Sequence, residues 1–458
     1  MIRLLLFVTL LSLPAFASAA EPVDIGSRLE LFVDDALIDH MSPGCRLDLK
    51  RPEPREVVLV TDRPWEGNTC AYYTIFQDGD IYRMYYRGSD WDEHAKKAKH
   101  REVACYAESR DGIHWEKPNL GLFEYNGSTD NNIVWDGPGT HNFTPFRDTN
   151  PDCPEDQQYK ALGVARGGLL AFASADGIHW RLLRDTPVIT RGAFDSQNLA
   201  FWDADRGEYR EYHRTFRDGV RDIQTGTSPD FLNWTDPVFI DTGDAPKEHL
   251  YTNAIAPYAR APHILLGFPT RFHPDLNDQV EPTLMVSRNR GHFRRYLDAV
   301  IPHTAPEDRS GNRSNYMAWG ILNLPGKPNE LSVYGTEAYY TGPDSRLRRF
   351  AYRTDGFVSL RADGKTGEAV TVPLTFTGKE LVLNLATHEG GHVRVELQDA
   401  EGKPLDGFTI EQCQPITGDA IEKTVQWKTT GDVSSLAGKP VRLHLQLKNA
   451  DVYSYRFR

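Results

Sequence analysis

The stretch Ser109-Arg110-Asp111-Gly112-Ile113-His114-Trp115 occurs a second time, nearly unchanged, as Ser174-Ala175-Asp176-Gly177-Ile178-His179-Trp180. Looser copies follow at Ser228–Trp234, at Ser287–Phe293 and, reduced to its turn, at Arg353–Phe357. Copies that return at similar intervals along a chain indicate a repeated supersecondary unit. The repeat therefore takes precedence over any single local pattern in deciding the fold.

Each copy predicts a tight hairpin turn that ends in a packed aromatic ring. Asp-Gly allows the positive φ that a two-residue turn requires, and the Ser and Asp side chains can accept hydrogen bonds from nearby backbone amides. Short runs rich in Tyr, Phe, Val and Ile precede each copy, so each unit reads as about four antiparallel strands. We therefore predict an all-β chain with a five-bladed β-propeller; the alternative is an array of β-sandwiches whose turns are alike by chance.

The pattern changes near Glu368, where the repeat stops. Short alternating strands separated by Gly, Asp and Pro are expected from there on, at Thr371–Phe376, Glu380–Ala386, His392–Asp399, Thr424–Trp427 and Val441–Lys448. Such strands are typical of a β-sandwich. The predicted organisation is a signal peptide over residues 1–20, a propeller with the catalytic site over 21–365, and a β-sandwich over 366–458.

The first twenty residues have the features of a secretory signal. Arg3 precedes the apolar run Leu4–Leu13, and small residues at Ala17–Ala19 suit cleavage. The apolar run is too short to span a membrane. We expect a secreted or periplasmic protein that has no membrane contact once the signal is removed.

Charge and cysteine content narrow the choice of partners and cofactors. The formal net charge of −12 makes a nucleic-acid backbone an unfavourable partner. The chain has five cysteines and no Cys-x-x-Cys pair, which argues against a zinc ribbon or a redox motif. One or two disulfides and five buried thiols are equally compatible with this spacing.

The geometry of a propeller predicts where a site would lie. The innermost strands of the blades begin around one central funnel. Reading one segment per blade for this position gives Trp65–Asn68, Phe146–Pro151, Phe194–Asn198, Glu248–Asn253 and Asn312–Tyr316. All five segments are polar, and the first four contain the carboxylates Glu66, Asp148, Asp195 and Glu248.

Converging carboxylates of this kind suit the cleavage of glycosidic bonds. Neighbouring carboxyl groups push their proton affinities apart, so that one stays protonated and one ionised near neutral pH. A glycosidase uses one as the general acid and the other as the nucleophile or base. Residues expected to contact the sugar are Trp65, Arg147, Gln197, Asn198, Tyr251, Asn253 and Arg313.

The blades, the central carboxylates and the trailing sandwich resemble the propeller glycoside hydrolases of families 32 and 43, the fructosidase and arabinanase group. The resemblance implies that Asp148, beside Arg147, stabilises the transition state, with Glu66 and Asp195 as base or nucleophile and as acid. The chain departs from the family pattern: Trp65-Glu66 stands in place of Asn-Asp-Pro, Pro151 is displaced from Arg147-Asp148, and Asp195 replaces the glutamate of the third blade. Glu248 is therefore an alternative acid, and Glu337 a further candidate.

Two other functions remain open at this point. A propeller that binds carbohydrate without cleaving it would use the same funnel, with the carboxylates holding sugar hydroxyls. A sialidase-like enzyme is suggested by the Ser-x-Asp-Gly-x-x-Trp turn, although no arginine triad for a sialic acid is evident. We expect a carbohydrate substrate and no cofactor or metal, since no ligand spacing argues for the calcium ion that some relatives hold.

Overall fold

The computed structural model describes residues 21–308 and 315–458 and consists of strands with three short 3-10 helices. The prediction of an all-β chain is confirmed. The helical turns are η1 (Glu155–Gln157), η2 (Pro274–Leu276) and η3 (Ser434–Leu436). Within the described residues, no helix has the length and apolar character needed to cross a membrane. The predicted signal peptide lies outside the described residues.

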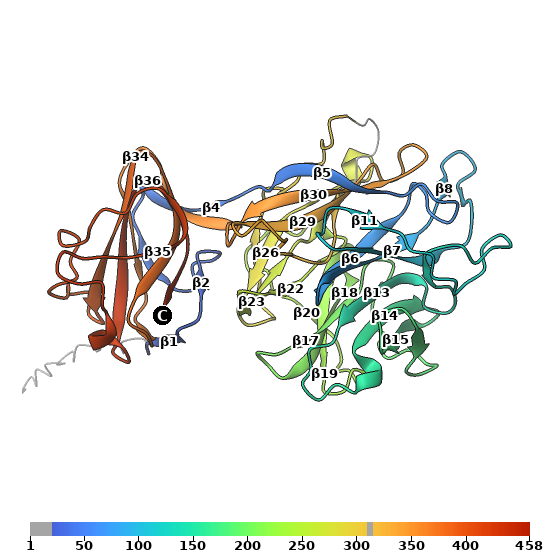
Figure 1. The fold of residues 1–458 in the computed structure, drawn as a ribbon, viewed down its shortest axis with the longest axis horizontal. Helices are drawn as coiled ribbons and strands as arrows, with labels where there is room; N and C mark the ends of the chain where they lie inside the picture. Colours follow the sequence, from blue (N-terminus) through green and yellow to red (C-terminus); the bar gives the residue numbers. More distant parts are fainter. Residues whose placement is uncertain (1–20, 309–314) are drawn as a thin grey trace, which may run out of the picture.

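Five antiparallel sheets follow one another along the middle of the chain and lie around a common centre (Figure 1). The first contains β6 (Ala71–Asp78), β7 (Ile81–Gly88), β10 (Val103–Ser109) and β11 (Trp115–Glu116), with β12 (Ile133–Trp135) beside β10. The second contains β13 (His141–Arg147), β14 (Tyr159–Ala165), β15 (Gly168–Ser174) and β16 (Trp180–Leu182). The third contains β17 (Leu199–Asp203), β18 (Glu208–Arg217), β19 (Val220–Ser228) and β20 (Val238–Phe239).

The last two propeller sheets are less regular. The fourth contains β22 (Ala256–Tyr258), β23 (Ala261–Gly267), β26 (Leu284–Ser287) and β27 (Arg294–Tyr296). The fifth contains β28 (Tyr316–Met317), β29 (Glu330–Glu337), β30 (Arg346–Arg353) and β5 (Glu53–Val60). Two small sheets accompany them: β21 (His249–Leu250) with β24 (Thr270–His273) and β25 (Gln279–Pro282), and β8 (Trp91–Asp92) with β9 (Lys97–Ala98).

The repeated heptapeptide forms the same loop after the third strand of the sheets that contain it. Asp111 Oδ1 accepts hydrogen bonds from the amides of Ile113 and His114, each at 2.8 Å, and Ser109 Oγ accepts one from Gly112 at 2.9 Å. Asp176 and Ser174 repeat these distances in the second sheet. Gly112 has the expected positive φ, 71°. The predicted two-residue turn is wrong, however, because Ser109 pairs with Trp115 across a longer loop that the Asp side chain holds together.

The fifth sheet is completed from the other end of the chain. Its outermost strand is β5, which precedes the first sheet in sequence and pairs antiparallel with β30. The inner strands also meet directly, because Thr74 of β6 bridges Trp319, which follows β28. The first and last sheets are thus joined by the bridge between their inner strands and by the chain that runs from β5 into β6, which closes the ring.

The C-terminal module is a ten-stranded sheet that takes four strands from the start of the chain. Its strands are β1 (Val23–Gly26), β2 (Glu30–Leu31), β3 (Ile38–Met41), β4 (Cys45–Leu49), β31 (Val358–Ala362), β32 (Gly367–Thr371), β33 (Leu374–Phe376), β34 (Leu381–Asp399), β35 (Asp419–Thr424) and β36 (Val441–Phe457). The sequence analysis placed residues 21–49 with the propeller; their ladder partners lie instead in β31, β32, β33 and β36. Ile25, Phe32 and Leu37 accordingly share a core with Trp427.

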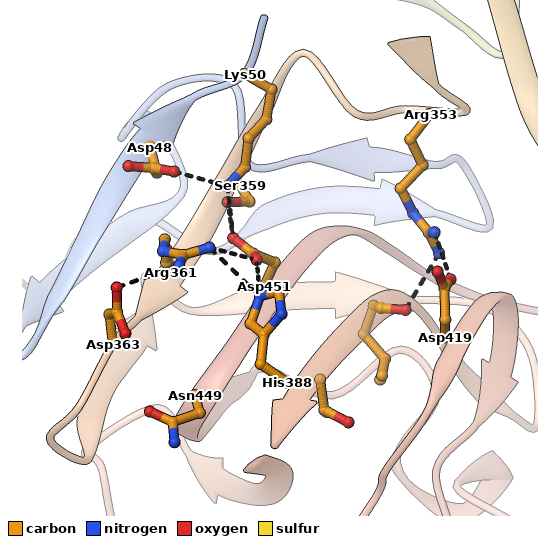
Figure 2. Close-up of polar contacts among 12 residues, drawn as sticks. Asp48, Lys50, Arg353, Ser359, Arg361, Asp363, His388, Asp419, Asn449 and Asp451 are labelled. Carbon is orange, nitrogen blue, oxygen red and sulfur yellow. Dashed lines mark hydrogen bonds and ion pairs between the residues drawn. The ribbon is translucent and has the colours of Figure 1, made fainter. Parts of the chain in front are cut away.

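A buried carboxylate fastens the N-terminal strands to the C-terminal ones (Figure 2). Asp451, on β36, accepts hydrogen bonds from Lys50 at 2.8 Å, Ser359 at 2.5 Å and Arg361 at 2.8 Å. His388 lies 2.9 Å from the same carboxylate. Burial favours the protonated form, but Lys50, Ser359 and His388 hold the pKa of Asp451 below its usual value.

The five cysteines are all free, so the disulfide alternative is wrong. Four of them are buried and Cys153 is half-buried. Burial raises the pKa of Cys45 to about 11, so this thiol stays protonated at neutral pH and packs as a small apolar group.

Replacing Asp451 by Ala should lower the free energy of unfolding by about 1.5–3 kcal/mol, because the half-buried Lys50 and Arg361 would lose the charged hydrogen bonds to their shared carboxylate. The measurement is denaturant unfolding of the whole chain. Asp419→Ala is the matched control: its side chain is 68% exposed and pairs with Arg353, so a loss below about 1 kcal/mol is expected. Equal losses in the two variants would contradict the assignment of Asp451 as the fastening group.

Candidate functional site

The first strand of each propeller sheet runs between two cavities, one at either end of the ring. The residues that follow these strands, or end them, line a cavity of about 720 Å³ that contains Phe146, Asp148, Trp202, Pro257 and Trp319. A second cleft of about 680 Å³ is lined by Tyr316 at the start of β28 and by the loops that join second and third strands, such as residues 339–342 between β29 and β30. A propeller site predicted from strand beginnings belongs at the second cleft.

Asp148 lies at the opposite end from the one expected. The prediction that Phe146–Pro151 begins an innermost strand is wrong, because β13 ends at Arg147. The error came from treating β14 as the first strand of the second sheet. Asp148 is buried, contacts Lys160, accepts a hydrogen bond from Tyr209 at 2.6 Å and lines the larger cavity. Arg147 lies beside it and pairs with Asp78 at 3.1 Å.

Glu66 is a buried member of a polar cluster within and beside the first sheet. Its side chain is fully shielded, with Lys117 Nζ at 2.6 Å and the Tyr86 hydroxyl at 2.5 Å. The neighbouring Trp65 donates its indole N–H to Asn132 at 2.7 Å and lines neither large cavity. These contacts bury Glu66 and pair its charge with that of Lys117.

Glu248 lies between two arginines beside a small cavity of about 30 Å³. Arg271 donates to it at 3.1 Å and Arg295 at 2.5 Å. The four predicted carboxylates therefore do not converge. Three of them are paired with lysine or arginine at separate places, and only Asp195 remains at the beginning of a first strand.

Three of the predicted sugar contacts are buried and bonded to backbone. Gln197 donates to the carbonyls of Tyr72 and Tyr73, each at 3.2 Å, and so ties the third sheet to the first. Asn198 donates to Phe194 and Ser196, and Asn253 to Tyr212. Arg313 lies outside the described residues.

The second cleft, here called the aromatic cleft, is walled by rings. Its aromatic lining residues are Trp91, Tyr251, Phe272, Tyr316, Tyr339 and Tyr340, and its charged ones are Glu93, Lys96, Arg221 and Asp278. Tyr316 packs edge to face on both Tyr251 and Tyr339, with ring centroids 5.9 and 5.4 Å apart. Tyr251 is the predicted contact residue that lines this cleft. Ring faces beside polar groups suit the two kinds of surface that a sugar presents.

An imidazole joins two carboxylates behind the lining of the cleft, to which they are connected through Arg87. His141, the first residue of β13, places Nδ1 2.6 Å from Glu102 Oε2 and Nε2 3.2 Å from Asp195 Oδ1. Burial alone would lower the pKa of His141, but the hydrogen bonds with Asp195 and Glu102 raise it to about 9. The His141 hydrogen bond in turn holds the pKa of Asp195 below its usual value. At neutral pH the ring is therefore an imidazolium that donates one N–H to each of two ionised carboxylates.

Arg87 connects this trio to the aromatic cleft. It is buried, lies 3.8 Å from Glu102 and donates to the hydroxyl of Tyr339 at 2.7 Å. Its guanidinium also lies over the ring of Tyr72, 4.8 Å from the centroid. A bound molecule that touches Tyr339 is thus one side chain away from the trio.

The sequence analysis missed Glu102, His141 and Arg87. His141 comes directly before the apolar run of β13, so correct strand bounds in the second sheet would have selected it. Arg87 lies within β7 and Glu102 directly before β10, next to ordinary β residues, and neither carries a local signal. In the described part of the chain, no group of three or more His, Cys, Asp or Glu side chains could hold a metal ion.

Comparison by sequence finds partial relatives, and no family model matches the chain. The uncharacterized protein Rv1502 of Mycobacterium tuberculosis strain H37Rv is 34% identical over 160 residues, which is 33% of this chain and 44% of that protein. An uncharacterized protein of the strain CDC 1551 is 33% identical over 158 residues, with the same coverage. The chain therefore spans less than half the length of these curated relatives.

Comparison by structure finds carbohydrate-active proteins at low similarity. A β-1,2-mannobiose phosphorylase from Listeria innocua aligns with 67% of this chain and 97% of its own, at 11% identity and a TM-score of 0.46. The α-L-arabinofuranosidase PaAbf62A from Podospora anserina aligns with 66% and 96%, at 9% identity and a TM-score of 0.42. An N-acetylgalactosamine deacetylase from F. plautii aligns with 68% and 96%, at 11% identity and a TM-score of 0.46. At these scores the likeness assigns no activity to the chain.

Replacing Asp195 by Asn should lower the pKa of His141 from about 9 toward its ordinary value near 6.5, because one of two charged partners is lost. The measurement is a pH titration of the histidine ring signals by NMR. Because folding raises this pKa, the stabilisation is present in full below about pH 6.5 and is lost as the pH rises through 9. A His141 signal that titrates near 6.5 in the unmodified protein would contradict the trio.

Glu66→Ala should lower the free energy of unfolding by about 3–5 kcal/mol, since Lys117 would keep its charge in a buried place. Thermal and denaturant unfolding measure the loss. Glu53→Ala is the control, because this side chain is 71% exposed. A variant at Glu66 that kept its stability and lost only a catalytic activity would return Glu66 to the site.

Proposed function

We propose that this chain is a secreted glycoside hydrolase, built on a five-bladed propeller, whose substrate lies in the aromatic cleft. The observation that carries the proposal is the Glu102–His141–Asp195 trio behind the lining of that cleft. In this proposal the catalytic carboxylates are Asp195, which the sequence predicted, and Glu102, which stands in place of Glu66, Asp148 and Glu248.

The shape and chemistry of the cleft support a sugar as its occupant. A cavity of about 680 Å³ lies in the size range of small-molecule sites and holds a short oligosaccharide segment. Tyr251, Tyr339 and Tyr340 offer ring faces for the apolar side of a pyranose or furanose ring, and their hydroxyls can donate to sugar oxygens. The polar lining residues supply further partners for hydroxyl groups.

The protonation state of the trio supports cleavage of the glycosidic bond. The reaction needs a proton for the leaving oxygen and an ionised carboxylate that acts on the anomeric carbon directly or through water. The lowered pKa of Asp195 keeps it ionised, as a base or nucleophile requires. The imidazolium of His141 donates one N–H to each carboxylate, so its protons belong to a coupled group, and one of them can reach the leaving oxygen from the ring or through Glu102.

The separation of the two carboxylates favours inversion over retention. Retaining enzymes place their carboxyl groups about 5–5.5 Å apart, and inverting enzymes about 6.5–9.5 Å, which leaves room for a water molecule. Glu102 and Asp195 contact different nitrogens of one imidazole, at 2.6 and 3.2 Å, so the ring lies between them. Export of the enzyme is supported by the signal sequence in residues 1–20.

The second candidate function is a propeller that binds carbohydrate without cleaving it. The observation that favours it is the pairing of Glu66 with Lys117, of Asp148 with Lys160 and of Glu248 with Arg271, which removes three acids from catalysis. Under this alternative the cleft still binds sugar, and Asp195 accepts hydrogen bonds from its hydroxyls.

Asp195→Asn and Glu102→Gln should each lower the rate of glycoside cleavage by about 10²- to 10⁴-fold, the usual contribution of one acid or base. Release of reducing sugar from a panel of polysaccharides and aryl glycosides measures the rate. The matched control is Asp236→Asn, an aspartate after the third sheet's repeat loop that is 79% exposed and pairs with Arg191. Asp148→Asn, at the other end of the ring, should keep its turnover number.

Three outcomes separate the candidates. Release by the unmodified protein and its loss in both trio variants support the hydrolase. Loss in Asp148→Asn alone would move the site to the larger cavity. Binding of a glycan with no release from any substrate would favour the non-catalytic propeller.

A further inference from the structure

We propose that the aromatic cleft selects an anionic saccharide, one that bears carboxylate or sulfate groups, and that Arg221 is the residue that binds the anion. The inference rests on the proposed carbohydrate site and names the chemical class of its ligand. It is carried by the state of Arg221, a cleft-lining guanidinium that is held in place by rings and has no acidic partner among the described residues.

Arg221 lies on β19, the third strand of the third sheet, and is fixed by aromatic faces. Its guanidinium carbon is 4.4 Å from the ring centroid of Phe272 and 5.1 Å from that of Tyr251. Both rings line the cleft. The side chain is therefore ordered by stacking and needs no carboxylate to hold it.

The hydrogen-bonding capacity of Arg221 is largely unused. Across the described residues it forms no ion pair, and its buried Nε has no hydrogen-bond partner. The polar contact that it makes runs from Nη1 to Nδ1 of His249, at 3.3 Å. Its neighbour Arg217 shows the usual arrangement instead, with Asp222 as its ion-pair partner.

Two more guanidinium groups lie behind the same wall. Arg214 lies over the ring of Tyr251, with its guanidinium carbon 4.6 Å from the ring centroid. Its Nε donates a hydrogen bond to the carbonyl of Ala193. Arg87 donates to Tyr339. Both arginines are buried, so their charge is weakly screened; Glu102, 3.8 Å from Arg87, offsets part of it, and the remainder adds to the positive potential inside the cleft.

The acidic residues of the cleft do not cancel this potential. Glu93 is occupied by Lys96 and by the indole N–H of Trp91. Asp278 is the other acidic lining residue, on the loop between η2 and β25, and its carboxylate can accept hydrogen bonds from sugar hydroxyls. Arg221 is left as the lining group that a negative charge would neutralise.

A stacked guanidinium presents its edge to a ligand. Arginine held on a ring keeps a planar set of N–H donors that matches the two oxygens of a carboxylate or a sulfate, and such charge-assisted pairs are stronger than bonds to neutral hydroxyls. A neutral sugar would leave the charge of Arg221 desolvated and unpaired, which disfavours binding. The cleft therefore selects its saccharide ligands more strongly by their charge than by the shape of their sugar rings.

The test is the binding of the full chain to an array of neutral, uronate-containing and sulfated oligosaccharides. The strongest ligands should be anionic, and Arg221→Ala should weaken their binding by about 10- to 100-fold, the loss expected for a hydrogen-bonded charge pair. Uronate ligands that bind while sulfated ones do not would identify a carboxylate, and the reverse would identify a sulfate. Arg191→Ala is the control, because Arg191 is 69% exposed and pairs with Asp236 away from the cleft.

Two further measurements distinguish the loss of an anion contact from a folding defect of the Arg221→Ala variant. Arg221→Lys keeps the charge and loses the planar fork, so its affinity should fall between those of the unmodified protein and Arg221→Ala. For the unmodified protein, added salt should weaken the binding of anionic ligands and leave that of neutral ligands nearly unchanged.

The failures of the inference and of the proposed function are distinguishable. Strongest binding to neutral glycans, unaffected by Arg221→Ala, overturns the anionic selection and leaves the carbohydrate site in place. Absence of binding to every glycan, together with no glycoside cleavage, removes the carbohydrate site itself and the inference with it.

Discussion

The ladder between β5 and β30 is the interaction on which the rest of the propeller depends. It is formed by a strand from before the first sheet and a strand of the last, so it closes the ring with hydrogen bonds rather than with side-chain packing alone. Closure also covers edges that would otherwise be free to pair with other chains. Because the ring is closed, the beginnings of the first strands are held at fixed spacing, and loops from different sheets can build one cleft.

The sequence was sufficient for the fold class because the repeat carries a local mechanism. Asp111 and Asp176 bind the two amides that follow the turn, and the repeat recurs wherever the third strand of a sheet ends. The second and third strands of the first three sheets could therefore be located from the sequence, but β13, the first strand of the second sheet, could not. The membership of β1 to β4 in the C-terminal sheet could not, because their partners are hundreds of residues away and short alternating strands do not specify which strand they pair with.

The site was harder to predict for a related reason. Sequence shows that Glu66, Asp148 and Glu248 are acidic, but their partners Lys117, Lys160 and Arg271 become apparent only in three dimensions. The sequence alone does not distinguish a carboxylate that is held in an ion pair from one that is free to react. Asp195 and Tyr251 were found because they lie directly before the first strands of the third and fourth sheets, whereas His141 was missed when the second sheet was counted from its second strand.

The dependence of both modules on the start of the chain has a consequence for the order of folding. During synthesis β1 to β5 leave the ribosome hundreds of residues before their partners among β30 to β36. Neither the ring nor the C-terminal sheet can be completed until nearly all of the chain has been made, and both require the closure of very long loops, which is slow. Until then the early strands carry unpaired edges and exposed apolar faces, the state in which large β proteins aggregate. Export before folding would separate the lengthening chain from its crowded surroundings until its two ends can meet.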